Sequence, residues 1–143
     1  MKVSLQLAIF VLSCWLIVPA GHAAQLSPFT SDGCSAFPDG TEEDNDKWLQ
    51  CCVAHDYAYW KGGTEDERLE ADKELRDCVV DVGEPETAEL MLSGVRVGGS
   101  PYWPTKFRWG YGWPFFRRYR PLNESELMQV RARSGDYGND KPE

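Results

Sequence analysis

One short run of the sequence combines two adjacent cysteines with residue types that perform acid–base chemistry. It contains Cys51, Cys52, His55, Asp56 and Tyr59 within nine positions. The chain has two histidines, and the other one lies in the first 23 residues. Imidazole is the side chain best suited to proton transfer near neutral pH. We therefore expect His55 to be the general base if the protein performs proton-transfer chemistry.

The elements around this run are predicted to be helices. Asn45 or Asp46 is the expected N-cap of the first helix, and the glycines at 62–63 end it because glycine accepts a left-handed backbone. Residues 64–67 have the Thr-x-x-Glu pattern of a capping box, which starts a second helix that ends at Gly83. Both segments carry apolar residues at helical spacing.

A third, shorter helix is expected from Pro85 to about Val97, and a last one after the Asn-x-x-Glu pattern at 123–126. The chain between them is rich in proline, glycine and aromatic residues, and the polar tail from Ser134 is expected to lack regular structure. The predicted fold class is mainly α. It consists of a disulfide-linked antiparallel helix pair, a metal-binding loop and an irregular, aromatic-rich C-terminal section.

The short glycine turn makes the first two helices antiparallel, so residues that face each other have a nearly constant sum of position numbers. The sum is 129 for Cys51 and Cys78 and 127 for His55 and Asp72. One register therefore places a disulfide between the helices and, one turn away, an aspartate beside the histidine. An aspartate that holds an imidazole in one tautomer makes the neutral ring a good base.

The cysteine count favours disulfides over a metal cluster. Of the five cysteines, Cys14 lies in the expected leader, so an even number remains. Adjacent cysteines point about 100° apart on a helix and fit poorly to the usual spacing of zinc ligands. With Cys51 paired to Cys78, Cys52 is left for Cys34. An exported chain is expected to keep both disulfides.

Residues 1–23 have the features of a signal peptide, with Lys2, an apolar run and small residues before an expected cut after Ala23. An uncleaved anchor and lipid attachment at Cys14 are the alternatives. We expect residues 24–143 to form a single domain that is secreted or periplasmic. Residues 25–89 hold 18 acidic and 5 basic side chains, which argues against a nucleic-acid partner.

Asp56 points to a different face of its helix from His55 and is therefore available to bind a cation. Carboxylate and backbone carbonyl oxygens are the ligands that calcium prefers. A disulfide between Cys34 and Cys52 would hold the turn-rich loop at 32–40 next to this carboxylate. The arrangement indicates a base that activates water beside a cation that polarises a carbonyl or phosphoryl oxygen.

The pattern Cys-Cys-x-x-His-Asp-x-x-Tyr resembles the active-site signature of the secreted phospholipase A2 family. Two further elements match that family: Asp72 lies six residues before Cys78, and Gly33 precedes Cys34. The resemblance covers about residues 31–80. It implies a calcium-dependent hydrolase whose substrate is a phospholipid or another lipid ester. It also implies the same two disulfides as the helix register.

The resemblance assigns a role to each residue of the expected site. His55 is the general base, Asp72 orients it, and Tyr59 donates a hydrogen bond to Asp72. Asp56 is the carboxylate ligand of a Ca2+ cofactor. The remaining calcium ligands are implied to be the backbone carbonyls of Gly33, Ser35 and Phe37.

The chain also departs from the family pattern. Residues 34–40 replace the usual glycine-dense calcium loop, which leaves Asp39 as an alternative ligand. Ala58 stands where many members have a cysteine, and the 16 residues between His55 and Asp72 leave no space for a β-hairpin. The C-terminal section has no counterpart in the family.

Residues 101–120 contain nine aromatic side chains and five basic ones. Aromatic rings and cations suit a membrane–water interface, so peripheral contact with a membrane surface is one interpretation. The other is that this segment covers the helix pair, with arginines stacked on rings. The acidic residues between positions 39 and 46 are interpreted as a solvated face, and Asn123 begins a glycosylation triplet.

Two functional classes other than an enzyme stay open. One is a phospholipase-like scaffold that binds calcium or lipid without catalysis, and the other is a protein-interaction module that uses residues 101–120. The intact set of His55, Asp56 and Asp72 favours the enzyme, because a scaffold has no need of all three.

Overall fold

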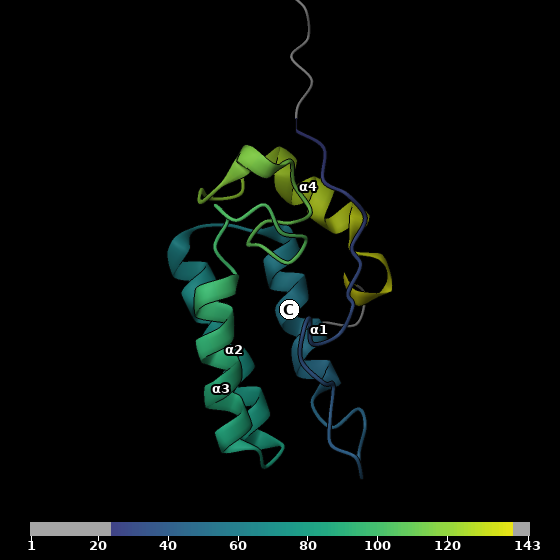
Figure 1. Ribbon diagram of the computed structural model, residues 1–143. Helices are drawn as coiled ribbons and strands as arrows, with labels where there is room; N and C mark the ends of the chain where they lie inside the picture. The colour runs from purple at the N-terminus through teal and green to yellow at the C-terminus, as the bar shows by residue number, and fades with distance from the viewer. Residues whose placement is uncertain (1–23, 139–143) are drawn as a thin grey trace, which may run out of the picture.

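The computed structural model describes residues 24–138, so the predicted signal peptide lies outside the described residues. Within this range the chain is helical and contains no strand. α2 packs against both α1 and α3, while α4 and the aromatic-rich segment lie at one end of the helices (Figure 1). The prediction of a mainly α fold is confirmed. The helices are α1 (Leu49–Lys61), α2 (Glu65–Asp81), α3 (Pro85–Gly98) and α4 (Glu124–Arg133), with 3-10 turns at Phe115–Arg117 and Gly135–Gly138.

Capping boxes start α2 and α4 where the sequence predicts them. In α2 the Thr64 side chain accepts a hydrogen bond from the Glu67 backbone N–H, and the Glu67 carboxylate accepts one from the Thr64 N–H. Asn123 and Glu126 make the same reciprocal pair at α4. These signals are local, because the bonds join residues only three apart in sequence.

The predicted start of α1 at Asn45 or Asp46 is wrong, because its N-cap is Trp48 and makes no side-chain capping bond. The Trp48 side chain is buried and its indole N–H donates to the Pro38 carbonyl at 2.6 Å. Its backbone N–H donates to the Asp39 carbonyl at 3.0 Å. These contacts with the preceding loop hold Trp48 outside the regular helix.

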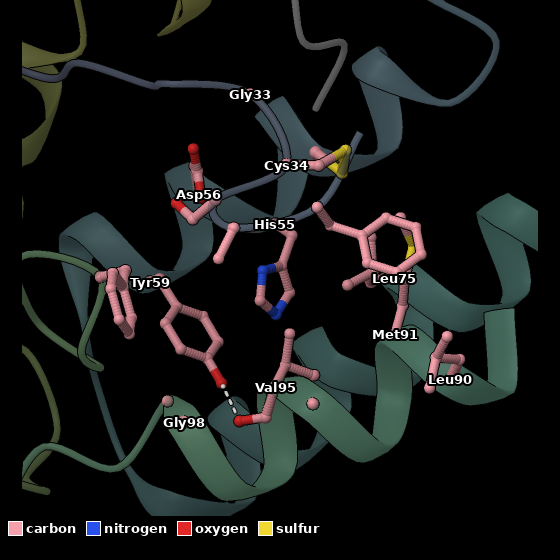
Figure 2. A pocket seen from close by; sticks show the side chains of 17 residues that line it. Gly33, Cys34, His55, Asp56, Tyr59, Leu75, Leu90, Met91, Val95 and Gly98 are labelled. Carbon is pink, nitrogen blue, oxygen red and sulfur yellow. Dashed lines mark hydrogen bonds between the residues drawn. A yellow bond between two sulfur atoms is a disulfide. The ribbon is translucent and has the colours of Figure 1, made fainter. Parts of the chain in front are cut away.

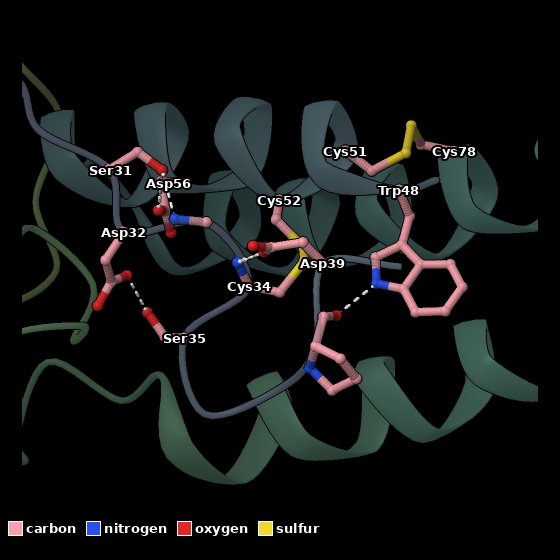
Figure 3. Close-up of a disulfide and its surroundings, with 12 residues drawn as sticks. Ser31, Asp32, Cys34, Ser35, Asp39, Trp48, Cys51, Cys52, Asp56 and Cys78 are labelled. Carbon is pink, nitrogen blue, oxygen red and sulfur yellow. Dashed lines mark hydrogen bonds between the residues drawn. A yellow bond between two sulfur atoms is a disulfide. The ribbon is translucent and has the colours of Figure 1, made fainter. Parts of the chain in front are cut away.

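Both predicted disulfides are present (Figure 3). Cys51–Cys78 joins α1 to α2 with 5.7 Å between the Cα atoms, and Cys34–Cys52 ties the loop to α1 with 5.0 Å. The side chains around them form one compact core between the loop, the helix pair and α3. Its buried members are Cys34, Trp48, Cys51, Cys52, Leu75, Val79, Ala88 and Met91.

The aromatic-rich segment closes the C-terminal end of α1, where the last carbonyls have no partner within the helix. The Gly110 N–H donates to the Tyr59 carbonyl at 2.6 Å, and the Trp113 indole donates to the Lys61 carbonyl at 2.7 Å. A Cβ on Gly62 would lie 2.9 Å from the Cα of Gly110. This close approach and the positive φ of Gly62 (64°) both require glycine.

The expectation that the tail lacks regular structure from Ser134 onward is wrong for residues 134–138. Ser134 is buried, and Gly135–Gly138 form a 3-10 turn. The Tyr137 ring packs on Tyr57 and Phe29 with centroid distances of 4.7 and 5.4 Å. These long-range aromatic contacts hold a segment whose own sequence is polar. None of the helices in residues 24–138 has the length and apolar character needed to span a bilayer.

Candidate functional site

α1 and α2 bring His55 and Asp72 together, as the helix register predicts. His55 Nε2 lies 3.0 Å from Asp72 Oδ1, and both residues are buried. Tyr59, one turn beyond His55 on α1, donates its hydroxyl to the same oxygen at 2.7 Å. The Tyr59 ring also packs against the imidazole, with 4.2 Å between centroids. Three side chains from two helices therefore form one buried polar cluster.

The hydrogen bond to Asp72 determines the tautomer of His55. An ionised carboxylate only accepts hydrogen bonds, so Nε2 carries the proton and Nδ1 has a free lone pair. Within residues 24–138, Nδ1 has no hydrogen-bond partner, and the imidazole lines a cavity (Figure 2). The ring is thus arranged to accept a proton from a molecule in that cavity.

Tyr59 acts as a neutral hydrogen-bond donor. Burial of its phenol and the nearby charge of Asp72 raise the pKa of Tyr59 well above its ordinary value. The hydroxyl therefore keeps its proton at any physiological pH. Its bond holds the Asp72 carboxylate in a fixed orientation toward His55.

Two arginines that the sequence analysis did not identify face the second oxygen of Asp72. Arg96 Nε of α3 lies 3.1 Å from Asp72 Oδ2 and Arg68 Nη2 of α2 lies 3.9 Å from it. The Arg96 contact has ion-pair distance without hydrogen-bond alignment, so we treat it as electrostatic. The i,i+4 spacing of Arg68 and Asp72 along α2 could have indicated the contact between these two residues. Arg96 carries no comparable local signal.

Asp56 lies beside His55 but faces the loop. Its carboxylate accepts a hydrogen bond from the Ser31 hydroxyl at 2.6 Å (Figure 3). Burial raises the pKa of Asp56 from 3.8 to about 6, the Ser31 bond opposes the rise, and the charge of Asp32 adds to it. At neutral pH this carboxylate is largely ionised, and within residues 24–138 it makes no salt bridge. Such a group favours a cation as its partner.

The loop that carries the expected calcium carbonyls is folded into tight turns. The Ser35 N–H donates to the Gly33 carbonyl at 3.0 Å, and the Phe37 N–H donates to the Cys34 carbonyl at 2.8 Å. Asp39 Oδ1 accepts from the Cys34 N–H at 2.8 Å, and its carboxylate occupies the space that a Cβ on Gly33 would need. The Asp39 side chain therefore stabilises the turn conformation of this loop.

A second cavity of about 470 Å³ also borders Asp56 and is lined by Asp32 and Ser31 as well. Asp32 accepts from the Ser35 hydroxyl at 2.6 Å and pairs with exposed Lys106 at 3.2 Å. No group of three or more His, Cys, Asp or Glu side chains that could hold a metal occurs in residues 24–138. A cation here would need backbone or hydroxyl oxygens in addition to carboxylates.

The cavity in front of His55 has a volume of about 400 Å³ and mainly apolar walls (Figure 2). One wall is the face of α3 that contains Gly94 and Gly98. A Cβ on Gly94 would meet no atom within 4 Å. Glycine inside a helix costs about 1 kcal/mol relative to alanine, and here it leaves the cavity wide. The larger apolar lining side chains are Phe37, Leu75, Leu90, Met91, Val95 and Phe107.

Residues 101–120 both cover the helices and expose aromatic rings. Trp109 and Trp113 are 1% and 2% exposed, and buried Arg117 pairs with Glu126 at 3.1 Å. These residues serve the interior, so Arg117 is not available for contact with a lipid head group. The exposed aromatic side chains of the segment are Tyr102, Trp103, Phe107 and Phe116.

No family model, curated protein or solved structure matches this chain.

Proposed function

We propose that the protein is a calcium-dependent lipid ester hydrolase of the secreted phospholipase A2 type. The observation that carries the proposal is the 3.0 Å contact between His55 Nε2 and Asp72 Oδ1, which leaves Nδ1 at an apolar cavity that also contains Asp56. A base, a neighbouring carboxylate and apolar walls are three parts that the hydrolysis of a lipid ester uses.

In the proposed reaction His55 activates a water molecule. Nδ1 accepts a proton from the water as its oxygen attacks the ester carbonyl carbon. Asp72 stabilises the imidazolium that forms, and Tyr59 keeps Asp72 in position. The imidazolium then gives the proton to the oxygen of the leaving alcohol as the carbon–oxygen bond breaks. The products are a carboxylic acid and an alcohol.

The residues next to the cavity fit a calcium ion. Asp56 would hold it, together with the backbone carbonyls of Gly33, Ser35 and Phe37. The fit is supported by the raised pKa of Asp56, about 6, because this half-buried carboxylate is partly removed from water and a bound cation would stabilise its charge. The Gly33 carbonyl also accepts from the Ser35 N–H, but a carbonyl has two lone pairs. When bound, calcium polarises the ester carbonyl.

The apolar cavity suits the acyl chain of a lipid. Its walls on α3 are open where Gly94 and Gly98 lack side chains, so a hydrocarbon chain can lie along the helix. Tyr102 and Trp103, which are more than half exposed, are candidates for contact with a membrane surface. The two disulfides agree with an oxidising compartment, which supports secretion or export to the periplasm.

The deciding experiment measures fatty-acid release from phosphatidylcholine vesicles by residues 24–143, with calcium and with a chelator. We expect calcium-dependent release by the wild type. His55→Gln should abolish release and retain calcium binding, whereas Asp56→Asn should lose both. Lys73→Gln, which changes an exposed side chain of α2, is the control and should behave as the wild type.

Two outcomes would support the other functional classes. Calcium and vesicle binding without any release of fatty acid would favour a non-catalytic lipid-binding scaffold. The absence of both calcium and vesicle binding would reject the phospholipase-type function and favour a protein-interaction module.

A further inference from the structure

Asp72 is a completely buried carboxylate, with 0% of its surface exposed. Its two hydrogen-bonded partners, His55 and Tyr59, both lie at Oδ1 and leave Oδ2 to other groups. Burying a carboxylate without a cationic partner is strongly disfavoured. Without such a partner nothing holds Asp72 Oδ2, the carboxylate can turn away from His55 Nε2, and the ring is free to carry its proton on Nδ1, facing the cavity.

Arg96 and Arg68 supply the positive charge that Asp72 requires. They come from α3 and α2 and approach the same oxygen, Oδ2, at 3.1 and 3.9 Å, while His55 and Tyr59 occupy Oδ1. Arg96 is held in place by a bond from its Nη2 to the Leu69 carbonyl at 2.9 Å.

Arg68 has further contacts that extend beyond Asp72. Its Nε donates to the Tyr59 hydroxyl at 3.0 Å, so it orients the same phenol that holds Asp72. Its Nη1 donates to Tyr119 at 2.9 Å, and its Nη2 donates to the Val95 and Arg96 carbonyls at 2.9 and 2.8 Å. The last contacts fasten α3 and the aromatic-rich segment to α2 and are structural.

We propose that Arg68 and Arg96 are positioning residues of the His55–Asp72 pair. They compensate the buried charge of Asp72 at Oδ2 and hold its Oδ1 against Nε2 of His55, which leaves Nδ1 free to accept a proton. This inference rests on the proposed function, because it describes how the base is maintained. Neither arginine touches the cavity in front of His55, so both act through Asp72.

The first test uses Arg96. In Arg96→Gln we expect kcat for fatty-acid release from phosphatidylcholine to fall roughly tenfold or more, since a buried acceptor loses its charged partner. KM and calcium affinity should change by less than about twofold, because the cavity and Asp56 are untouched. Arg96→Lys should recover most of the loss. The matched control is Arg76→Gln, which removes an arginine of α2 that pairs only with Asp77 on the surface.

A double-mutant cycle tests whether Arg96 acts through Asp72. In an Asp72→Asn background, Arg96→Gln should cause little further loss of kcat, because the charge that it compensates is gone. Equal fold-losses in the two backgrounds would overturn the inference, and so would an Arg96→Lys variant no better than Arg96→Gln.

A separate pair of variants distinguishes two roles of Arg68: orienting Tyr59 and Asp72, and holding the aromatic-rich segment against α2. Tyr119→Phe removes only the Arg68–Tyr119 bond and should leave kcat unchanged. Arg68→Lys keeps the charge but loses the planar fork that orients Tyr59, and it should lower kcat with a smaller effect on KM. Equal losses of kcat in both variants would assign Arg68 a structural role alone.

A spectroscopic readout tests the inference independently of activity. Residues 24–143 contain a single histidine, so the ring 15N shifts of His55 report its tautomer directly at a fixed pH above neutrality. The wild type should show the proton on Nε2, and Arg96→Gln should shift the population toward Nδ1. An unchanged tautomer in that variant would refute the inference. Absence of hydrolysis by the wild type, with the expected tautomer change, would instead reject only the proposed function.

Discussion

Replacing Asp56 with asparagine should make the metal-free protein more stable, although it removes a residue of the proposed site. Burial raises the pKa of Asp56 from 3.8 to about 6 in the folded protein. A carboxyl group whose pKa is raised on folding stabilises the fold only where it is protonated. Its contribution is fully present below pH 3.8 and is lost as the pH rises through about 6.

The magnitude follows from the size of the shift. A rise from 3.8 to about 6 corresponds to an upper limit of ~3 kcal/mol at neutral pH, at ~1.4 kcal/mol per pKa unit. Solvent at the half-buried carboxylate reduces this figure, and asparagine can still accept the Ser31 hydrogen bond. We expect Asp56→Asn to raise the free energy of unfolding by ~1–2 kcal/mol, or the melting temperature by ~4–8 °C in a domain of this size.

The assay is thermal unfolding of residues 24–143 followed by circular dichroism, in chelator and then in calcium. In chelator Asp56→Asn should melt above the wild type at neutral pH, and the difference should vanish toward pH 3.8, the ordinary pKa of the group. Calcium should raise the melting temperature of the wild type alone, because binding to the folded state stabilises it. Asp46→Asn, an exposed carboxylate, should change nothing.

Two results would refute this reasoning. One is a metal-free Asp56→Asn variant that is less stable than the wild type, since the carboxylate would then have a compensating partner. The other is a stability difference that stays constant between acidic and neutral pH, which would show that the ionisation of Asp56 is not its source.

Three further outcomes are expected. Replacing both Cys51 and Cys78 with serine should lower the free energy of unfolding by ~3–4 kcal/mol in denaturant titrations, because the disulfide closes a 27-residue separation. A change below ~1 kcal/mol would contradict a stabilising role of this disulfide. Gly94→Ala should stabilise α3 by up to ~1 kcal/mol because its Cβ meets nothing within 4 Å. Gly94→Leu should instead fill the cavity, and it should slow the hydrolysis of long-chain esters more than that of a short soluble ester. Arg117→Gln should destabilise the fold by ~3 kcal/mol, because it breaks the buried pair with Glu126. The control Arg118→Gln changes an exposed side chain and should alter stability by less than ~0.5 kcal/mol. Equal effects in the two variants would contradict the expected importance of burial.

Local sequence signals were sufficient for several elements of the fold. The Thr64-x-x-Glu67 box starts α2 because both partners lie within one turn. The contact between His55 and Asp72 was also predictable, since a short turn between two helices leaves one antiparallel register and the cysteines fix its phase.

Long-range contacts decided what local signals could not. Trp48 is the N-cap of α1 in place of Asn45 or Asp46 because its buried indole donates to the Pro38 carbonyl. In the sequence, Arg96 looks like a surface residue near the end of a helix. Only the packing of α3 on α2 brings it to Asp72. A pattern along one helix contains no information about a side chain that arrives from another.

The aromatic-rich segment gives the clearest division between the two kinds of information. By itself the sequence determined the helix register, the disulfide pairing and the residue types that meet at His55. Its composition could not separate rings that cover the helices from rings that face solvent, since both are the same residue types. The tertiary structure buries Trp109 and Trp113 on the end of α1 and leaves Trp103 exposed. Exposure depends on what packs against a side chain, and that is a property of the folded chain alone.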